Sequence, residues 1–456
     1  MKAAARALAE WGLDLSYLDI PPSVADAARR HLTDGLGVAI AAARTNAVPA
    51  AIAVASSPRR SGEATIIGFG VKEPAQMAAF ANGALVHALD YDDTHTGSLV
   101  HTTAAVLPAA FAVGEETNAS GSEVLAACIA GYEVVTRLGA AVPHGFHKRG
   151  FHATSACGVF ASALIAARLM RLDVDRATNA LGIAGSLASG SLEFLNTGTS
   201  TKQLHPGFAA MNGIIAARLA AAGADGPETI LEGGYGLFRS FTGDSVDPAK
   251  LTDGLGSRWE TEQITIKPYA ACQLVHASLD ALASIAIDAR DVDSIVFDIP
   301  PDSIPIVCEP AGSKRQPRTP YEGKFSLPYC AAALLIDGQI TIDSFDEARL
   351  ERKEILDLTS RISYRAKAFA GVPADAPGIV EVTLSDGRVS KGRAERSRGG
   401  ADLPLTNHDL MEKFIANCGG DRRQAEKLGE SVLLEMHAQQ ISDVLGTTAT
   451  FVGSDR

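Results

Sequence analysis

The sequence predicts a mainly α-helical protein, with a large all-α helical bundle domain and a smaller α+β domain. Three observations support this fold class. Glycine is abundant, with 43 residues, whereas aromatic residues make up only 6%, and this mix favours small-residue helices over a β-sandwich. Apolar residues recur at helical intervals from about residue 22 to about residue 219. After about residue 267, alternating segments rich in β-branched residues appear.

At roughly 100–200 residues per domain, a chain of 456 residues suggests two or three domains, and these patterns divide it into two. We assign residues 1–266 to the helical domain, which the C-terminal residues 400–456 are expected to rejoin. The α+β domain is assigned to residues 267–399. We see no internal repeat and no low-complexity linker between them.

Local signals mark several helices of the first domain. Pro21 and Pro22 precede the stretch SVADAARRHLTDGLGVAIAAA, and proline suits the first turn of a helix. Ser120 and Glu123 have the spacing of a capping box and open the apolar run VLAACIAGYEVVTRLG. Further helices are predicted in EPAQMAAFANGALVHALD, SACGVFASALIAARLM and GFAAMNGIIAARLAAAG, whose small residues allow close helix crossing.

The second domain mixes helices and strands. Helices are predicted in QLVHASLDALASIAI, KFSLPYCAAALLIDG and FDEARLERKEILDLTSRI, whereas DSIVFDIP predicts a strand. The stretch IVEVTLSDGRVSKGRA predicts two strands, because Asp386-Gly387 is typical of a hairpin turn. After Thr406, the segment NHDLMEKFIANC returns to a helical pattern.

Composition disfavours several classes of function. The net charge of −12 makes non-specific binding to nucleic acid or to an acidic membrane unfavourable, whereas an anionic substrate could bind in a local cationic pocket. The six cysteines are scattered and form no C-x-x-C pair, so we expect neither a disulfide framework nor an iron–sulfur cluster. Glu10 and Asp14 interrupt the apolar N-terminal stretch, unlike a signal peptide, and no run of eighteen apolar residues occurs. We therefore expect a cytoplasmic protein without a membrane span.

The densest polar cluster lies between two predicted helices. It holds three aspartates and three histidines within fifteen positions, namely His87, Asp90, Asp92, Asp93, His95 and His101. An arbitrary loop of this composition is most often solvated and caps its own helices. A metal site is a second interpretation, since histidine and aspartate bind zinc and other divalent ions. No established metal-ligand spacing supports that interpretation, so we expect no metal.

Two further clusters precede apolar helices. His152 follows a glycine-bracketed turn and stands near a predicted helix N-terminus, where the helix dipole favours bound anions. The alternative for this segment is an ordinary exposed basic loop. Thr199, Ser200 and Lys202 lie in the segment NTGTSTKQLHPG, which lacks the spacing of a nucleotide-binding loop. Its backbone N–H groups, hydroxyls and lysine could still hold a carboxylate.

The fourth cluster falls at the proposed domain boundary, where clefts often form. It contains Lys267, Cys272 and His276 in IKPYAACQLVH. Taken alone, a lysine before a proline is most often a surface residue, and Cys272 is more often a buried apolar residue than a nucleophile. His276 lies on a predicted helix and could be a satisfied core histidine.

Together these segments resemble the MmgE/PrpD family, which includes 2-methylcitrate dehydratases, cis-aconitate decarboxylases and iminodisuccinate epimerases. The resemblance covers nearly the whole chain. It rests on seven motifs in order: ALVHALDYDDTH, HTTAAVLPAAFAVGE, GYEVVTRLG, GFHATSACGVFASA, GTSTKQLHPGFAAMNG, IKPYAACQLVHASLDAL and YEGKFSLPYC. Two departures touch the substrate pocket. His101 is followed by Thr102-Thr103 where members often read Pro-Ser, and His152 by Ala153 where proline is common.

The resemblance implies an active site between the helical domain and an α+β lid domain, with no metal or organic cofactor, in a homodimer. The positions where the family keeps its acid/base and carboxylate-binding residues are Asp93, His101, His152, Lys202, Lys267 and Tyr329. We expect Thr199, Ser200 and His276 to contact the substrate, a small anionic di- or tricarboxylate.

The expected chemistry is movement of a proton next to a carboxylate. Lys202 and Lys267 would bind substrate carboxylates, and His101 or His152 would transfer the proton, with Asp93 as an orienting group or as the base. The leading expectation is dehydration of a hydroxy-tricarboxylate such as 2-methylcitrate. The alternatives on the same scaffold are a cis-aconitate-type decarboxylase and an iminodisuccinate-type epimerase. A metal-dependent hydrolase using the Asp/His cluster, or a non-catalytic binding protein, would be a different class.

Overall fold

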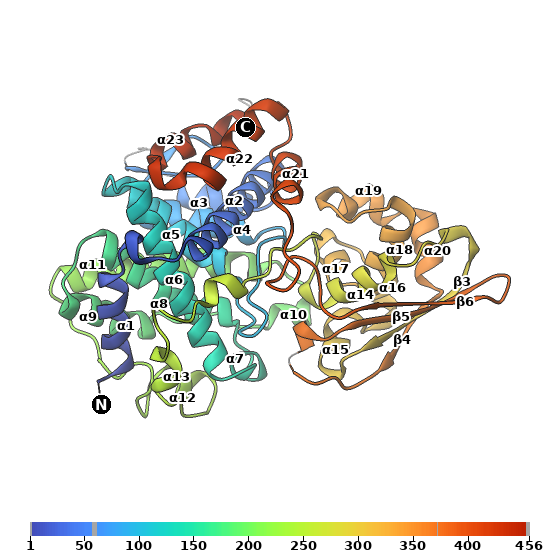
Figure 1. The fold of residues 1–456 in the computed structure, drawn as a ribbon, viewed down its shortest axis with the longest axis horizontal. Helices are drawn as coiled ribbons and strands as arrows, with labels where there is room; N and C mark the ends of the chain where they lie inside the picture. The colour runs from blue at the N-terminus through green and yellow to red at the C-terminus, as the bar shows by residue number, and fades with distance from the viewer. Residues whose placement is uncertain (1, 57–61, 372, 453–456) are drawn as a thin grey trace.

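The chain folds into a large helical part and a smaller part built on a β-sheet, which lie end to end (Figure 1). This computed structural model describes residues 2–56, 62–371 and 373–452. Helices dominate and strands are confined to two small sheets, so the predicted mainly α class is confirmed.

The helical part contains the helices predicted for the first two hundred residues. Its long helices are α1 (Ala4–Asp14), α2 (Pro22–Arg44), α4 (Ala75–His87), α5 (Thr102–Glu116), α6 (Gly121–Ala141), α8 (Ala153–Leu169), α9 (Val174–Ser186) and α11 (His205–Ala221). Its short elements are α3 (Pro49–Ala55), β1 (Ala64–Thr65), β2 (Lys72–Glu73), α7 (Gly145–Lys148), α10 (Phe194–Thr197), α12 (Leu237–Phe241) and α13 (Ala249–Thr252). The predicted capping box at the start of α6 is present, with the Ser120 and Glu123 side chains each bonded to the other's backbone N–H.

Small residues bring the central helices together, as the composition predicts. A side chain at Gly83 of α4 would place its Cβ 2.6 Å from the backbone nitrogen of Gly207 on α11. On the other side of α11, a Cβ at Gly213 would lie 2.7 Å from the backbone nitrogen of Ala163 on α8. The backbones of α4, α11 and α8 therefore pack almost in contact, and this packing fixes the end of α4, from which the candidate site begins.

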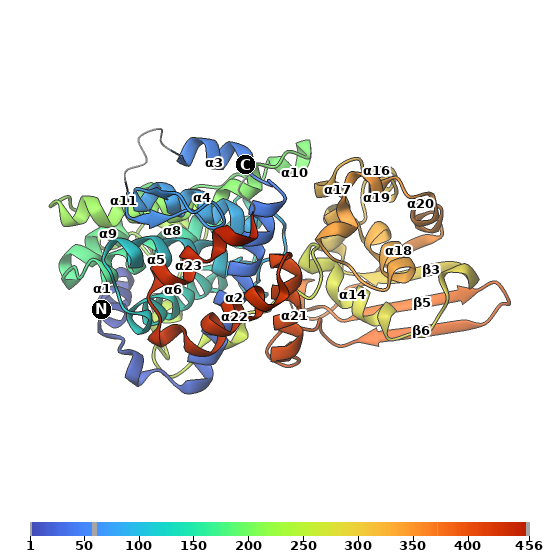
Figure 2. The same cartoon turned by 90° about the horizontal axis from the view of Figure 1, so that it is seen from above.

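Helices from the end of the chain pack on the helical part (Figure 2). They are α21 (Asn407–Cys418), α22 (Arg422–Glu435) and α23 (Ile441–Gly446). Both α21 and α22 lie along α2, where a Cβ at Gly37 would lie 2.8 Å from the ring of Phe414. A capping box at Thr406 opens α21, where the sequence predicted a return to helix.

The smaller part contains a four-stranded sheet in the order β4-β3-β5-β6. Its strands are β3 (Val292–Ile299), β4 (Ile362–Ala366), β5 (Gly378–Leu384) and β6 (Val389–Ala394). Strand β3 runs parallel to β4 and antiparallel to β5, and the predicted hairpin joins β5 to β6. Its helices are α14 (Gln273–Ala283), α15 (Ile304–Val307), α16 (Ala311–Arg315), α17 (Pro320–Lys324), α18 (Leu327–Asp337), α19 (Glu347–Leu350) and α20 (Lys353–Thr359).

One predicted helix of this part is wrong in its extent. The stretch FDEARLERKEILDLTSRI forms the two short helices α19 and α20, and its end begins strand β4. The helical pattern fails there because Ile362 is a buried β-branched residue that pairs with Ile295 of β3, so tertiary pairing overrides the local periodicity.

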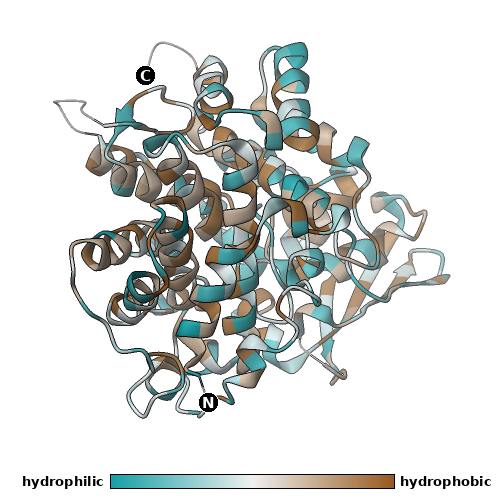
Figure 3. Cartoon of the chain, turned by 60° about the vertical axis from the view of Figure 1, so that its left-hand side comes forward, coloured by the Kyte–Doolittle hydropathy of each residue, from teal (hydrophilic) through white to brown (hydrophobic). Residues whose placement is uncertain are grey.

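Apolar stretches run along the helices of the larger part (Figure 3). Among the described residues, α6 is long and apolar enough to cross a membrane by length and composition, but 94% of its most apolar window is buried inside the protein. Neighbouring helices therefore cover its apolar surface. The homodimer expected from the sequence stays a prediction, because the structure describes a single chain.

Candidate active site

The loop between α4 and α5 carries the densest polar cluster, and the structure buries it. Asp90, Asp92 and Asp93 are each at most 2% exposed. Asp90 has a positive φ of 52°, a backbone conformation that aspartate tolerates better than most residues. The solvated, self-capping loop typical of such a composition is therefore not what this chain forms.

Two lysines from distant segments hold Asp90. The Nζ atom of Lys202 donates to its carboxylate at 2.6 Å, and that of Lys267 donates to its backbone carbonyl at 2.8 Å. Burial alone would raise the pKa of Asp90, but the charges of Lys202 and Lys267 outweigh it and hold that pKa well below its usual value. Burial alone would lower the pKa of Lys202, but the attractions of Asp90, Tyr321 and Asp92 together outweigh it and raise that pKa. Both shifts favour the ion pair.

Two more buried lysines bind the carbonyls on either side of Asp90. Lys324 of α17 donates to the carbonyl of Leu89 at 2.6 Å, and Lys413 of α21 donates to that of Tyr91 at 3.0 Å. Lys413 also pairs with the Asp34 carboxylate at 2.6 Å. Burial lowers the pKa of Lys324 to about 8. Three consecutive carbonyls are thus fixed by lysines from three separate segments.

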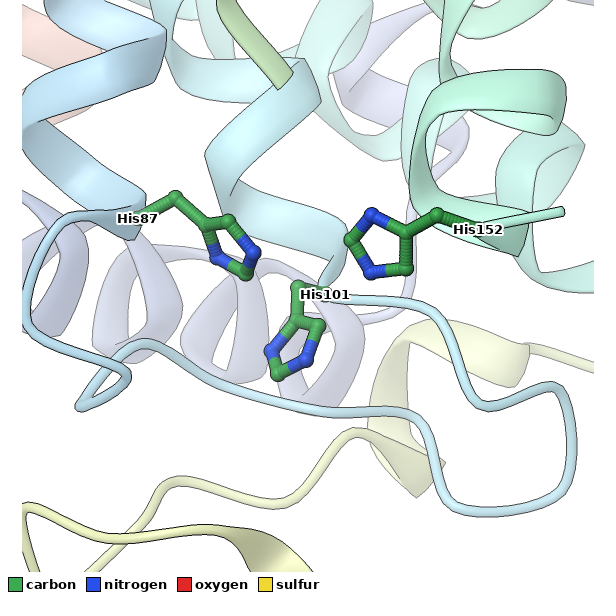
Figure 4. Close-up of side chains that lie close together, drawn as sticks. All are labelled: His87, His101 and His152. Carbon is green, nitrogen blue, oxygen red and sulfur yellow. The ribbon is translucent and has the colours of Figure 1, made fainter. Parts of the chain in front are cut away.

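Three histidines meet beside this loop and form the histidine cluster: His87 at the end of α4, His101 before α5 and His152 before α8 (Figure 4). One ring nitrogen from each lies within 4.8 Å of the others. Burial lowers the pKa of all three, and the nearby charge of Lys202 lowers them further. The three rings are therefore neutral at pH 7.

Each ring is oriented through its Nδ1 atom. His87 Nδ1 lies 2.7 Å from a carboxylate oxygen of Asp92, and His101 Nδ1 lies 3.1 Å from the backbone carbonyl of Asp93. His152 Nδ1 lies 3.1 Å from Nδ1 of His205, the first residue of α11. Such partners fix the direction of each ring toward the space that the cluster surrounds.

A cavity of about 340 Å³ opens beside the histidine cluster, between the helical part and the α+β part. Its wall from the helical part includes Asp90, Thr94, His101, His152 and Lys202. The α+β part contributes Cys272, Gln273, Leu274, Asp302, Ile306, Phe325 and Pro373. This volume suits a small organic ligand, and its position at the junction of two parts is common for binding sites.

The expected residues divide between the cavity wall and a supporting layer. His101, His152 and Lys202 line the cavity. Lys267 is fully buried behind Asp90, so it acts on the wall through that carboxylate.

Asp93 accepts hydrogen bonds from the Thr102 and Thr103 side chains and does not line the cavity, and burial raises its pKa to about 7. The carboxylate on the wall is Asp90, whereas Asp93 contacts His101 through its backbone carbonyl, and its role as orienting group or base stays a prediction.

The tyrosine expected in the site does not line the cavity. The Tyr329 hydroxyl donates to the carbonyl of Ser344 at 2.8 Å, inside the smaller part and away from the cavity. Tyr321, on the preceding helix α17, lies behind the wall and near its charged residues. Its hydroxyl is buried without a hydrogen-bond partner among the described residues, and the charges of Lys202 and Asp90 act on it. Its ring packs against Phe325 of the cavity wall, with ring centroids 5.0 Å apart.

The three expected substrate contacts lie outside the wall as well. Thr199 and Ser200 are exposed, because they sit in the turn that precedes the short helix carrying Lys202. His276 is fully buried in α14, and its Nε2 lies 3.0 Å from the carbonyl of Ala271. It is a core histidine, the alternative that the sequence left open.

Matches to family models show that the chain belongs to the MmgE/PrpD family. The MmgE/PrpD N-terminal domain matches residues 6–249, and the MmgE/PrpD C-terminal domain matches residues 269–434. The resemblance inferred from the seven motifs is therefore confirmed.

Similar proteins include several that are named cis-aconitate decarboxylase. The protein of that name from Aspergillus terreus is 28% identical over 457 residues, covering 93% of this chain and 92% of the relative. The one from Homo sapiens is 32% identical over 373 residues, covering 76% and 73%, and the one from Mus musculus is 30% identical over 371 residues, covering 75% and 72%.

Replacing Asp90 with asparagine is expected to destabilise the protein strongly. Asparagine tolerates the left-handed backbone at this position, so the change removes the charge without straining the chain. Lys202 and Lys267 are then left buried without their carboxylate, and removing one partner of a buried pair costs about 3–5 kcal/mol. Thermal unfolding should show a large fall in Tm. The control Asp402→Asn breaks an exposed pair with Arg396 and should leave Tm nearly unchanged.

A double variant tests whether the loss comes from the pair itself. Asp90→Asn combined with Lys202→Met should lose less stability than the sum of the two single changes, because neither charge of this pair remains unpaired and only Lys267 still lacks its carboxylate. Strictly additive losses would contradict the assignment of this ion pair.

Proposed function

We propose that this protein is a cofactor-independent decarboxylase of cis-aconitate or a closely related unsaturated tricarboxylate. The observation that carries the proposal is the set of charged and titratable side chains on the cavity wall. It holds two lysines and four histidines, Lys148, Lys202, His101, His144, His147 and His152, against the two aspartates Asp90 and Asp302. Names of the similar proteins favour decarboxylation over the dehydration of 2-methylcitrate that the sequence led us to expect.

The electrostatics of the wall suit a ligand with several negative charges. Burial lowers the pKa of all four histidines, so the empty cavity avoids an accumulation of positive charge. A bound polycarboxylate raises the pKa of these histidines again, because nearby anions favour the protonated imidazole. The substrate thereby promotes the protonation of the group that will donate a proton to it.

The proposed reaction breaks one carbon–carbon bond and forms one carbon–hydrogen bond. Carbon dioxide leaves the carboxymethyl arm of cis-aconitate, and the electron pair of the broken bond forms a new terminal double bond. The electrons of the former double bond shift onto the carbon that carries the other terminal carboxylate, and this carboxylate becomes part of an enediolate. A proton added at that carbon gives itaconate, so one proton is consumed for each carbon dioxide released.

Residues of the wall, and Tyr321 behind it, have distinct parts in this scheme. Lys202 binds the carboxylate that gains charge, since positive charge placed where negative charge develops lowers the barrier. His101 or His152 donates the proton to carbon. Tyr321 donates a hydrogen bond to a substrate carboxylate, because burial raises the pKa of its hydroxyl and keeps it protonated.

Dehydration and epimerisation would use the same residues on other substrates, so product analysis separates them from decarboxylation. A metal-dependent hydrolase, suggested by the Asp/His cluster, would lose its activity to a chelator. The decarboxylase proposed here would keep its activity in EDTA.

Turnover in deuterated water tests the reaction most specifically. We expect itaconate with one deuterium on its saturated methylene carbon and none on the terminal alkene, measured by ¹H NMR alongside release of carbon dioxide. Treatment with EDTA should not reduce the rate. Conversion of 2-methylcitrate without any conversion of cis-aconitate would contradict the proposal and restore the dehydratase.

A pair of tyrosine variants tests whether Tyr321 or Tyr329 contributes to the reaction. Tyr321→Phe should lower kcat/KM by roughly 10- to 10²-fold, the loss expected for a hydrogen bond to a charged group of about 1.5–3 kcal/mol. Tyr329→Phe removes the same hydroxyl away from the cavity and should change kcat/KM less than about twofold. The opposite ranking would return Tyr329 to the site.

A further inference from the structure

The histidine cluster leaves three ring nitrogens without an assigned partner. Each ring is engaged through Nδ1, and no hydrogen bond to Nε2 of His87, His101 or His152 occurs among the described residues. Nε2 of His87 is buried as well as unpartnered. Asp92 and Asp90 each also have one buried carboxylate oxygen without a hydrogen-bond partner in the described part of the chain.

Hydrogen bonding fixes the tautomer of two of the rings. A carboxylate and a carbonyl only accept, so the Nδ1 atoms of His87 and His101 carry their protons toward Asp92 and the carbonyl of Asp93. Their Nε2 atoms then present lone pairs. His152 shares a proton with His205 between two Nδ1 atoms, and the tautomer that donates to His205 leaves a third lone pair. A histidine held by a carboxylate in this way is the usual form of a zinc ligand.

We propose that His87, His101 and His152 bind a divalent transition-metal ion such as Zn²⁺, and that the bound ion blocks the cavity. The second half of this proposal rests on the proposed function, because the blocked substrate would be the polycarboxylate. The ion is an inhibitor and not a resident cofactor. Imidazole nitrogen is a preferred ligand of zinc, copper and nickel, whereas magnesium and calcium prefer oxygen.

The geometry sets the expected strength of binding. Nitrogens bound to one tetrahedral zinc ion at about 2.1 Å lie about 3.4 Å apart, whereas one ring nitrogen of each histidine here lies within 4.8 Å of the other two. These separations must therefore shrink by up to about 1.4 Å, a change that the rings share as they approach one another. The ammonium group of Lys202 also opposes a second cation nearby. Both factors favour reversible binding, weaker than at a structural zinc site.

Binding of Co²⁺ to the full-length, chelator-treated protein is the direct test, because it involves no substrate. We expect one Co²⁺ per chain, with a visible absorption band of nitrogen ligation that Zn²⁺ removes by displacement. His87→Gln and His152→Gln, on different elements, should each weaken binding by at least tenfold. The control His147→Gln changes a histidine of the same cavity wall outside the cluster and should weaken binding less than about threefold.

The outcomes separate this proposal from the proposed function. Wild-type protein that takes up no Co²⁺, or variants that all weaken binding equally, would overturn the metal site even if the protein decarboxylates cis-aconitate. If Co²⁺ binds as expected, turnover at a buffered free Zn²⁺ concentration should fall in wild type, and an unchanged rate would overturn the inhibitory role. Loss of turnover in EDTA would instead make the ion a cofactor and contradict that role.

Discussion

The site depends on one interaction, the buried ion pair between Asp90 and Lys202, supported from behind by Lys267. Asp90 is held in a left-handed backbone conformation, and its carboxylate and carbonyl are each bound by a lysine from elsewhere in the chain. A buried carboxylate with such partners cannot move without leaving charge unpaired. The loop therefore presents a fixed charge pattern to the cavity.

The two parts of the molecule contribute differently to this site. The helical part supplies the histidine cluster, whose helices are locked by close backbone packing. The α+β part supplies Phe325 to the wall, and its Lys324 reaches across to the carbonyl of Leu89. The lysine contact ties the position of the smaller part to the conformation of the loop that carries Asp90. The geometry of this loop is therefore coupled to the smaller part through that buried hydrogen bond.

Local signals in the sequence predicted much of the fold but only part of the site. The capping box at Ser120 and the turn at Asp386-Gly387 are set by neighbouring residues and were predictable. Strand β4 was not, since it exists through its pairing with β3. In the site, three aspartates within four consecutive positions of one loop could not be told apart from the sequence, because the folded backbone, with its positive φ at Asp90, places only Asp90 on the cavity wall. Lys413 comes from a C-terminal amphipathic helix without a catalytic motif. Tyr321 and Tyr329 lie on two different helices, α17 and α18, and only the packing of these helices decides which tyrosine lies near the charged residues of the site.

The central claim is that Lys202 receives a carboxylate of a polyanionic ligand in the cavity. Calorimetric binding of propane-1,2,3-tricarboxylate, which lacks the double bond needed for the reaction, tests it most directly. Wild-type protein should bind this compound at least ten times more tightly than a folded Lys202→Met variant does, since a charge-assisted hydrogen bond is worth about 1.5–3 kcal/mol. Equal affinities in the two proteins would contradict the account.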